Sequence, residues 1–148
     1  MTNMEIKKAW EQMKRDIKKE LGKEYHGFNY GFTMNARQIE NRTATFTICN
    51  TRTYEKCIAY EQECIEMVRS GNYGDKRRAE IIKYHEDNIK FYEGLRERFG
   101  NRENEVAWAT KAFENSKAFE KFQNTVGKTT WELETKDNGF VYGMRFHY

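Results

Sequence analysis

The 148-residue chain contains no proline, and its only cysteines are Cys49, Cys57 and Cys64. Without proline, no turn is fixed by a rigid ring, so the loops depend on glycine, asparagine and aspartate. Cys57 and Cys64 lie seven residues apart in a helical pattern, about 10 Å along the axis, which is beyond the reach of a disulfide. We therefore expect reduced thiols that pack as small hydrophobic side chains, as in cytoplasmic proteins.

Long hydrophobic runs are also missing. No apolar stretch approaches the ~18 residues that suggest a transmembrane helix. The segment from Met1 to Leu21 is charged throughout and lacks the apolar centre of a signal peptide. These absences predict a soluble cytoplasmic protein without membrane contact.

The 26 basic residues (Lys and Arg) are nearly balanced by 23 acidic residues (Asp and Glu). The formal net charge is +3 and the sequence pI is 8.7, whereas dedicated nucleic-acid-binding domains usually have a basic stripe and a pI above about 9. Charged residues make up 33% of the chain and aromatic residues 15%. We expect a heavily solvated surface around an aromatic core.

Catalytic signatures are absent as well. His26, His85 and His147 fall in three different predicted elements, and none has a partner at metal-ligand spacing. There is no nucleophile elbow, phosphate-binding loop or dinucleotide motif. The segment 134–136 (Glu-Thr-Lys) matches half of a metal-dependent nuclease site, but no strand-borne carboxylate precedes it in the expected place. We predict a non-enzymatic protein with no metal and no cofactor, and an enzyme of unrecognised type is the alternative.

Hydrophobic periodicity defines the expected elements of the first half. Apolar residues at steps of three and four predict a helix that ends near Leu21, and Thr2 and Glu5 have the spacing of a capping box. Alternation predicts strands over 26–34 and 43–49, joined by a polar loop over 35–42. A second helix, capped by Asn50 or Thr51, reaches the Gly-rich segment 70–74.

The second half is helical before it returns to strands. A helix capped by Asp75 is expected to end at Gly100. Residues 101–126 form one helix, or two helices broken near 115–116; this break could be the turn of a DNA-binding helix pair, although a kinked core helix is the simpler interpretation. Strands are predicted over 129–134 and 140–148, around an Asp-Asn-Gly turn at 137–139.

These elements follow the order α-β-β-α-α-α(α)-β-β. The order predicts an α+β protein with a single antiparallel sheet of about four strands and helices packed mainly on one face. No linker or repeat interrupts the chain, so residues 1–148 are predicted to form a single globular domain.

One basic, Gly-rich stretch is the main candidate binding site. It runs from Arg69 to Arg78, and its candidate contact residues are Arg69, Tyr73, Lys76, Arg77 and Arg78. Arginine forks suit phosphate or carboxylate groups, and Tyr73 could stack on a base or anchor a protein interface. An ordinary solvated loop between two helices is the simpler interpretation.

A second cationic patch is predicted near the sheet edge. Its residues are Arg37, Arg42 and Arg52, together with Gln38. If helices cover only one face of the sheet, the other face is polar and open, as many antiparallel sheets are. This open face would carry Asn29, Thr33, Thr45, Thr47, Glu132, Glu134, Arg145 and His147.

In length, in composition rich in Lys, Glu, Asn and Tyr, and in its lack of motifs, the chain resembles small phage-encoded anti-defence proteins of the anti-CRISPR type. The resemblance covers size and composition and carries no site residues. It implies an inhibitor that docks on a host nucleic-acid-handling or defence complex. The alternative is direct binding of nucleic acid, or sequestering of a nucleotide ligand, through the basic loop over 69–78. A homodimer through a sheet edge or a helix face is compatible with the sequence.

Overall fold

A computed structural model describes residues 1–22, 24, 31–50, 52–135 and 141–148 of the chain. It separates into two compact units: unit 1 comprises residues 1–51 and 106–148, and unit 2 comprises residues 52–105. The element order and the four-stranded antiparallel sheet confirm the predicted α+β class. The single domain over 1–148 stays a prediction. None of the described helices is long and apolar enough to span a membrane.

Unit 1 contains the sheet, whose strands are all antiparallel to their neighbours in the order β1-β2-β4-β3. The strands are β1 (Gly31–Thr33), β2 (Thr43–Asn50), β3 (Thr130–Thr135) and β4 (Val141–His147). The register pairs Phe46 with Met144 and Ala44 with Phe146. Because side chains alternate along each strand, these residues share one apolar face while the intervening polar residues occupy the other.

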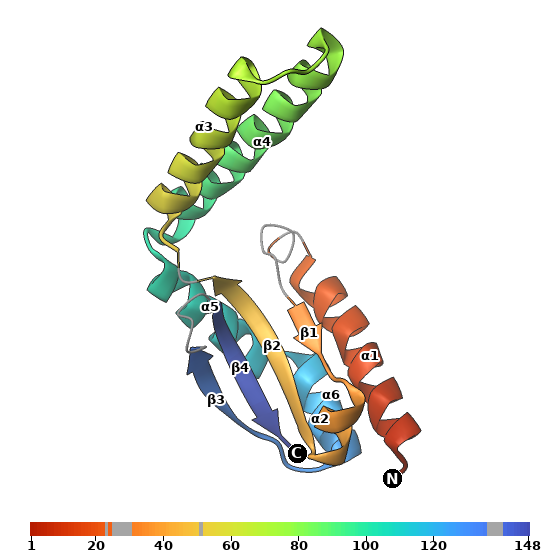
Figure 1. Cartoon of the computed structure of the whole chain (residues 1–148). Helices are drawn as coiled ribbons and strands as arrows, with labels where there is room; N and C mark the ends of the chain where they lie inside the picture. The colour runs from red at the N-terminus through yellow and green to blue at the C-terminus, as the bar shows by residue number, and fades with distance from the viewer. Residues whose placement is uncertain (23, 25–30, 51, 136–140) are drawn as a thin grey trace. The chain divides into compact units, whose positions relative to one another are not determined.

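Helices cover the apolar face of this sheet (Figure 1). Unit 1 contains α1 (Asn3–Leu21), α2 (Ala36–Glu40), α6 (Lys117–Val126) and, from residue 106 onward, α5 (Arg102–Glu114). At the end of α1, the Glu20 carboxylate accepts hydrogen bonds from the backbone N–H groups of Lys117 (2.8 Å) and Ala118 (3.2 Å). Glu20 thereby satisfies otherwise unpaired donors at the start of α6.

Aromatic rings fill the space between the helices and the sheet. Phe113 of α5 lies 5.0 Å from Phe46 and 5.1 Å from Phe146, measured between ring centroids. Trp10 of α1 meets Phe122 of α6 edge to face at 5.5 Å. All five side chains are buried, and such pairs contribute about 0.5–1.5 kcal/mol each beyond their buried area. The expected aromatic core is therefore present in unit 1.

The structure refines the predicted boundaries. The segment 35–42 is not entirely loop, because an Asn35–Gln38 capping box starts α2 and Ile39 is buried beneath it. The Thr2–Glu5 capping box is confirmed. The break near 115–116 separates two helices, and Ser116 caps the second. The expected strand residues 26–30 and the turn at 137–139 lie outside the described residues.

Unit 2 is a helical hairpin of α3 (Tyr54–Ser70) and α4 (Asp75–Phe99), followed by the first turn of α5. Figure 1 shows α3 and α4 lying antiparallel along their length. Thr53 caps α3, rather than Asn50 or Thr51, because its hydroxyl accepts the hydrogen bond from the Lys56 N–H. Gly100 ends α4 with a φ of 81°, a conformation that glycine adopts without steric cost.

The aromatic core should determine the stability of unit 1. Replacing Phe146 with alanine removes a buried ring that touches Trp10, Phe113 and Phe119, so we expect a loss of about 3–5 kcal/mol in the free energy of unfolding. Urea unfolding followed by tryptophan fluorescence measures this loss selectively, because all three tryptophans of the sequence belong to unit 1. Leu133→Ala, at a half-exposed position on the edge strand β3, should cost less than about 1 kcal/mol. Equal losses in the two variants would contradict this account of the core.

A candidate binding hairpin

A buried ion pair fixes the base of the hairpin in unit 2. The Arg102 guanidinium lies 2.8 Å from Glu105 Oε1, and both residues are at least 93% shielded from solvent. Tyr54 donates its hydroxyl proton to the same carboxylate at 2.7 Å. Arg102 Nε also donates to the carbonyl of Arg52 at 3.0 Å. This base clamp, formed by Arg102, Glu105 and Tyr54, joins the start of α3 to the start of α5.

Aromatic rings enclose the same guanidinium. Arg102 lies over the ring of Tyr54 at 4.6 Å and near the ring of Tyr92 at 5.8 Å, measured to the ring centroids. Burial in this environment raises the pKa of the Tyr92 hydroxyl above its ordinary value. A buried charge of this kind is tolerated only where its partners are complete, so the base clamp depends on all of its members.

A second polar pair lies between the two helices. His85 Nδ1 of α4 is 2.5 Å from Glu61 Oε2 of α3, and both side chains are largely buried. His85 is thus a hydrogen-bonded interior residue, and no group of three or more metal-ligating side chains is found among the described residues. Together with the buried side chains of Ile58, Ile65 and Val68, this pair fixes the alignment of α3 against α4.

At the other end, Arg78 organises the loop that joins α3 to α4. Its guanidinium donates to the carbonyls of Val68 (3.4 Å), Gly71 (3.1 Å) and Tyr73 (3.0 Å), and it lies 3.2 Å from the Asp75 carboxylate. Three of these four contacts go to backbone carbonyls, one in the last turn of α3 and two in the loop that follows it. Arg78, one of the predicted contact residues, is therefore a structural residue of the loop.

The remaining residues of the predicted site stand around this loop. Tyr73 is exposed, and its ring lies so close to Gly71 that a Cβ there would approach the ring to 2.7 Å. The side chains of Lys76 and Arg77 are exposed and make no ion pair within the described chain. Arg69 pairs with Glu66 at 2.7 Å, on a solvent-exposed part of α3. The hairpin tip, defined as Arg69, Tyr73, Lys76 and Arg77, presents one aromatic ring and three cations.

The other predicted cations do not join the tip. Arg52 precedes α3, so a helix about 25 Å long separates it from the tip. Its guanidinium lies 5.8 Å from the centroid of the Tyr60 ring. Arg37 and Arg42 are exposed residues of unit 1, in α2 and just after it. The eight predicted residues thus occupy several locations, and the structure groups only those of the loop.

The polar face of the sheet is arranged as expected. Thr33 pairs with Thr45 and Thr45 with Arg145 in the register, while Glu132, Glu134 and His147 lie on the same side of β3 and β4. Arg145 reaches Glu134 at 2.7 Å and His147 lies 3.6 Å from Glu132. Arg145 balances one of the two glutamates, and His147 adds a positive charge only when it is protonated, so the face offers no excess of positive charge to a ligand. Asn29 lies outside the described residues.

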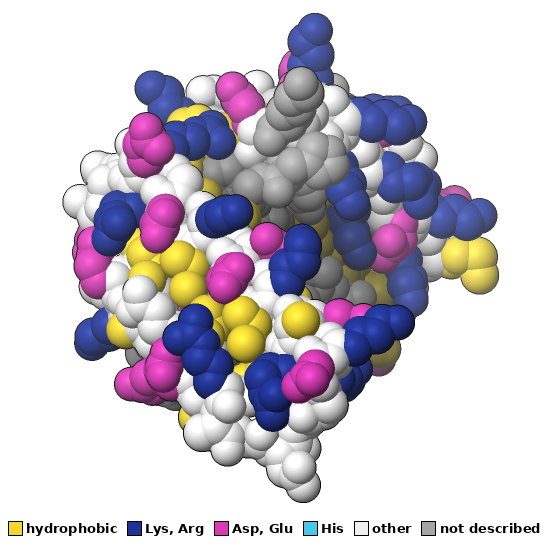
Figure 2. Space-filling model, turned by 90° about the horizontal axis from the view of Figure 1, so that it is seen from above, with side chains coloured by type: hydrophobic (Ala, Val, Ile, Leu, Met, Phe, Trp, Pro, Cys, Tyr) yellow, Lys and Arg dark blue, Asp and Glu magenta, His cyan; other side chains and the backbone are white. Residues whose placement is uncertain are grey.

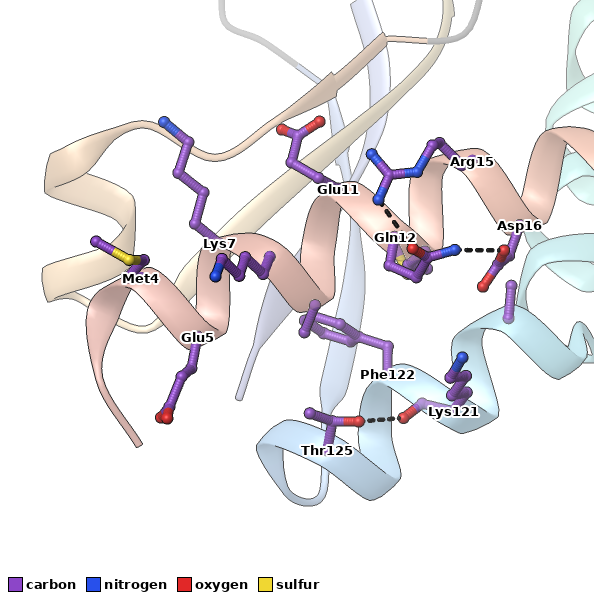
Figure 3. A pocket seen from close by; sticks show the side chains of 14 residues that line it. Met4, Glu5, Lys7, Glu11, Gln12, Arg15, Asp16, Lys121, Phe122 and Thr125 are labelled. Atoms are coloured by element: carbon purple, nitrogen blue, oxygen red, sulfur yellow. Dashed lines mark hydrogen bonds between the residues drawn. The ribbon is translucent and has the colours of Figure 1, made fainter.

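A groove of about 770 Å³ lies between α1 and α6 (Figure 3). Buried Met13, Ala118 and Phe122 contribute to its apolar part. Two of its polar residues are already partnered, since Gln12 donates to Asp16 at 2.8 Å and accepts from Arg15 at 2.8 Å. Acidic and basic side chains mix along its rims. The groove therefore carries no clear chemical preference.

Inspection of the sequence missed a second stripe on the hairpin. The predicted inner stripe of α4 contains His85 and Tyr92. Tyr84 and Phe91 each precede one of these residues, so they are also seven residues apart on one side of the helix, and both are exposed. Of the eight large hydrophobic side chains that are exposed among the described residues, five lie on the hairpin: Tyr60, Met67, Tyr73, Tyr84 and Phe91. The seven-residue spacing of Tyr84 and Phe91 in the sequence could have indicated this second apolar stripe.

Comparison of the chain with protein-family models, with curated proteins and with solved structures finds no match. What the chain does must therefore be inferred from its own side chains and their geometry.

Loss of the base clamp should unfold the hairpin. Arg102→Ala leaves the Glu105 carboxylate buried without its cation, and we expect a loss of about 3–5 kcal/mol in unfolding free energy. The matched control is Arg96→Ala, which removes an exposed arginine 3.8 Å from Glu55 and should cost no more than about 1 kcal/mol. Urea unfolding followed by far-UV circular dichroism measures both, and a similar small loss for the two variants would refute the proposed role of the clamp.

Loss of Arg78 should loosen the tip without unfolding the helices. In Arg78→Ala, the carbonyls of residues 68, 71 and 73 lose the guanidinium that links them, so the amide protons of segment 71–75 should exchange faster with solvent. Hydrogen exchange read by mass spectrometry reports this locally. Lys83→Ala, which removes an exposed i,i+4 pair with Asp87, should leave the exchange of this segment unchanged. Unchanged exchange in Arg78→Ala would show that the loop is held by other contacts.

Proposed function

We propose that this chain is a non-enzymatic binding protein that docks on an acidic surface of a larger protein through its hairpin tip. One observation carries this proposal: Arg78 fixes the loop by contacts to three carbonyls, while Tyr73, Lys76 and Arg77 beside it remain exposed. A loop held in this way loses little conformational entropy when it binds, which favours affinity. Tyrosine and arginine are also the side chains that most often dominate the energy of protein interfaces.

The charge distribution favours a protein partner over nucleic acid. Unit 2 contains eleven basic and twelve acidic residues, a net charge of −1, so its cations are local to the tip. Figure 2 shows a face of the molecule on which, among the residues drawn in colour, Lys and Arg side chains intermingle with Asp and Glu. Nucleic-acid affinity depends on how many phosphates are neutralised. The few cations of the tip would give only weak, strongly salt-dependent binding to nucleic acid.

The resemblance in size and composition to anti-defence proteins supports a narrower form of this proposal. In that form, the larger protein belongs to a nucleic-acid-handling or defence complex in the cytoplasm of a bacterial host, and the chain is a phage or mobile-element inhibitor of that complex. The cationic tip would engage an acidic surface of such a complex through charge complementarity.

The proposal is tested by capture from bacterial lysate with the tagged chain, with and without nuclease, followed by affinity measurements on the captured protein. Tyr73→Ala and Arg77→Glu should each weaken binding at least about tenfold, as expected when a contact at the centre of an interface is lost. Lys90→Glu is the matched control, since it makes the same charge change at an exposed position on the same helix, about four turns from the tip. It should bind like the unmodified chain.

Three outcomes would decide against this reading. A captured protein whose affinity is unchanged by Tyr73→Ala and Arg77→Glu would place the interface elsewhere. Recovery of nucleic acid alone, released by salt, would favour direct nucleic-acid binding through the tip. Catalytic turnover of a substrate by the purified chain would exclude a purely binding function.

A further inference from the structure

The longest helix of the protein lacks a complete packing partner. Of the 25 residues of α4, only Leu95 is buried, whereas α1 buries four residues over 19. The interior positions Ile82, His85 and Ile89 of α4 remain partly exposed. Amphipathic helices are stabilised mainly by burying an apolar face against other elements. Contact with α3 alone leaves α4 with apolar surface still to be covered.

This uncovered surface is gathered on one face of the hairpin. The two helices meet along a line of interior residues that includes Glu61, Val68, His85 and Tyr92. The residue just before each of these is apolar and exposed: Tyr60 (53% of its surface), Met67 (72%), Tyr84 (63%) and Phe91 (37%). One step back along an α-helix turns the side chain by about 100° around the helix axis. When two helices run antiparallel, this step away from the line of contact brings the side chains of both helices to the same face of the pair. These four residues therefore form a single apolar face.

The opposite side of the hairpin is polar. The residues that follow the same four interior positions are Gln62, Arg69, Glu86 and Glu93, and all are exposed. Two more residues complete the apolar face: Cys64 and Ile81, both partly buried. Hydrogen bonding with Cys64 raises the pKa of Tyr60 above its ordinary value. The six residues are uncharged, and the exposed charged residues Lys56, Glu63, Glu80 and Asp87 lie three or four positions from them on the same helices.

The size of this face matches that of a protein interface. The length of α3 is about 25 Å, and two packed helices are together about 20 Å wide. One whole side of the hairpin, with the six apolar residues and the charged residues beside them, therefore covers about 500 Å², or about 1,000 Å² between two copies, which is the lower limit for a specific interface.

We propose that the apolar face binds the apolar face of a second copy of the chain, so that two hairpins form an antiparallel four-helix bundle. Two features favour a second copy over an unrelated partner. The six residues that define the face are uncharged, so two-fold pairing of these residues brings no like charges together. The face runs along both helices, as a bundle requires.

The tip cations determine how the two hairpins are oriented. If both tips lay at the same end, Lys76 and Arg77 of the two copies would repel one another. With the tips at opposite ends, a distance of about 25 Å or more separates the two clusters, well beyond the screening length of about 8 Å in physiological salt. The dimer therefore displays its two tips at opposite ends of the bundle, available for the proposed partner.

Analytical ultracentrifugation of the full chain over a range of concentrations tests this inference. The unmodified chain should sediment as a dimer that dissociates on dilution. Met67→Lys with Tyr84→Lys, at two exposed positions, should sediment as a folded monomer with the same far-UV circular dichroism. The matched control, Gln62→Lys with Glu86→Gln, makes the same charge change on the polar face and should remain a dimer.

Thiol labelling gives a second measurement that does not depend on any variant. Cys64 is the one cysteine that is not buried, so its rate of reaction with a maleimide should fall as the protein concentration rises and the face becomes covered. A monomer at all concentrations, a dimer that persists in Met67→Lys with Tyr84→Lys, or a labelling rate independent of concentration would each overturn the inference. Tyr73→Ala and Arg77→Glu should leave the dimer intact, so failure of the tip proposal is distinguishable from failure of this one.

Discussion

The hairpin depends on a carboxylate and a guanidinium that are both removed from water. Glu105 accepts from Arg102 and Tyr54 at the same oxygen, and Arg102 uses further donors on the carbonyl of Arg52. Because both charges are buried, any weakening of one contact leaves a poorly solvated ion. The strands and helices of unit 1 rely on aromatic packing that tolerates some rearrangement, whereas this clamp is specified by individual atoms. It thereby sets where α3 begins and how α5 starts.

Most of the fold could be predicted from the sequence, because its elements are encoded by local patterns. The alternation of Phe46 with threonines predicted β2, and the Thr2–Glu5 spacing predicted the start of α1. The short helix α2 was missed because five residues give no periodicity, and its cap at Asn35 resembles ordinary loop chemistry. The order of the strands in the sheet was not predictable either. It follows from long-range packing of β4 against β2, which no local pattern records.

The site was less predictable, for a physical reason. Composition identified the basic loop over 69–78 but could not distinguish a cation that holds the loop from one that faces solvent. Arg78 and Arg77 are adjacent in sequence and differ only in which carbonyls come within reach. Likewise, Arg102 and Glu105 resemble any exposed i,i+3 pair, and only the surrounding rings of Tyr54 and Tyr92 show that they are buried.

Unit 1 is built from two separate segments of the chain, residues 1–51 and 106–148, and this affects how it forms during synthesis on the ribosome. The strand β4 lies between β2 and β3 in the sheet but follows both in sequence. Until it emerges, β2 exposes an unpaired edge that could join with another chain. The hairpin of unit 2, built from contacts close in sequence, is complete well before that and folds quickly. Nascent chains should therefore carry a finished hairpin beside an open half-sheet, the state in which this protein is most exposed to misassembly and most in need of chaperones.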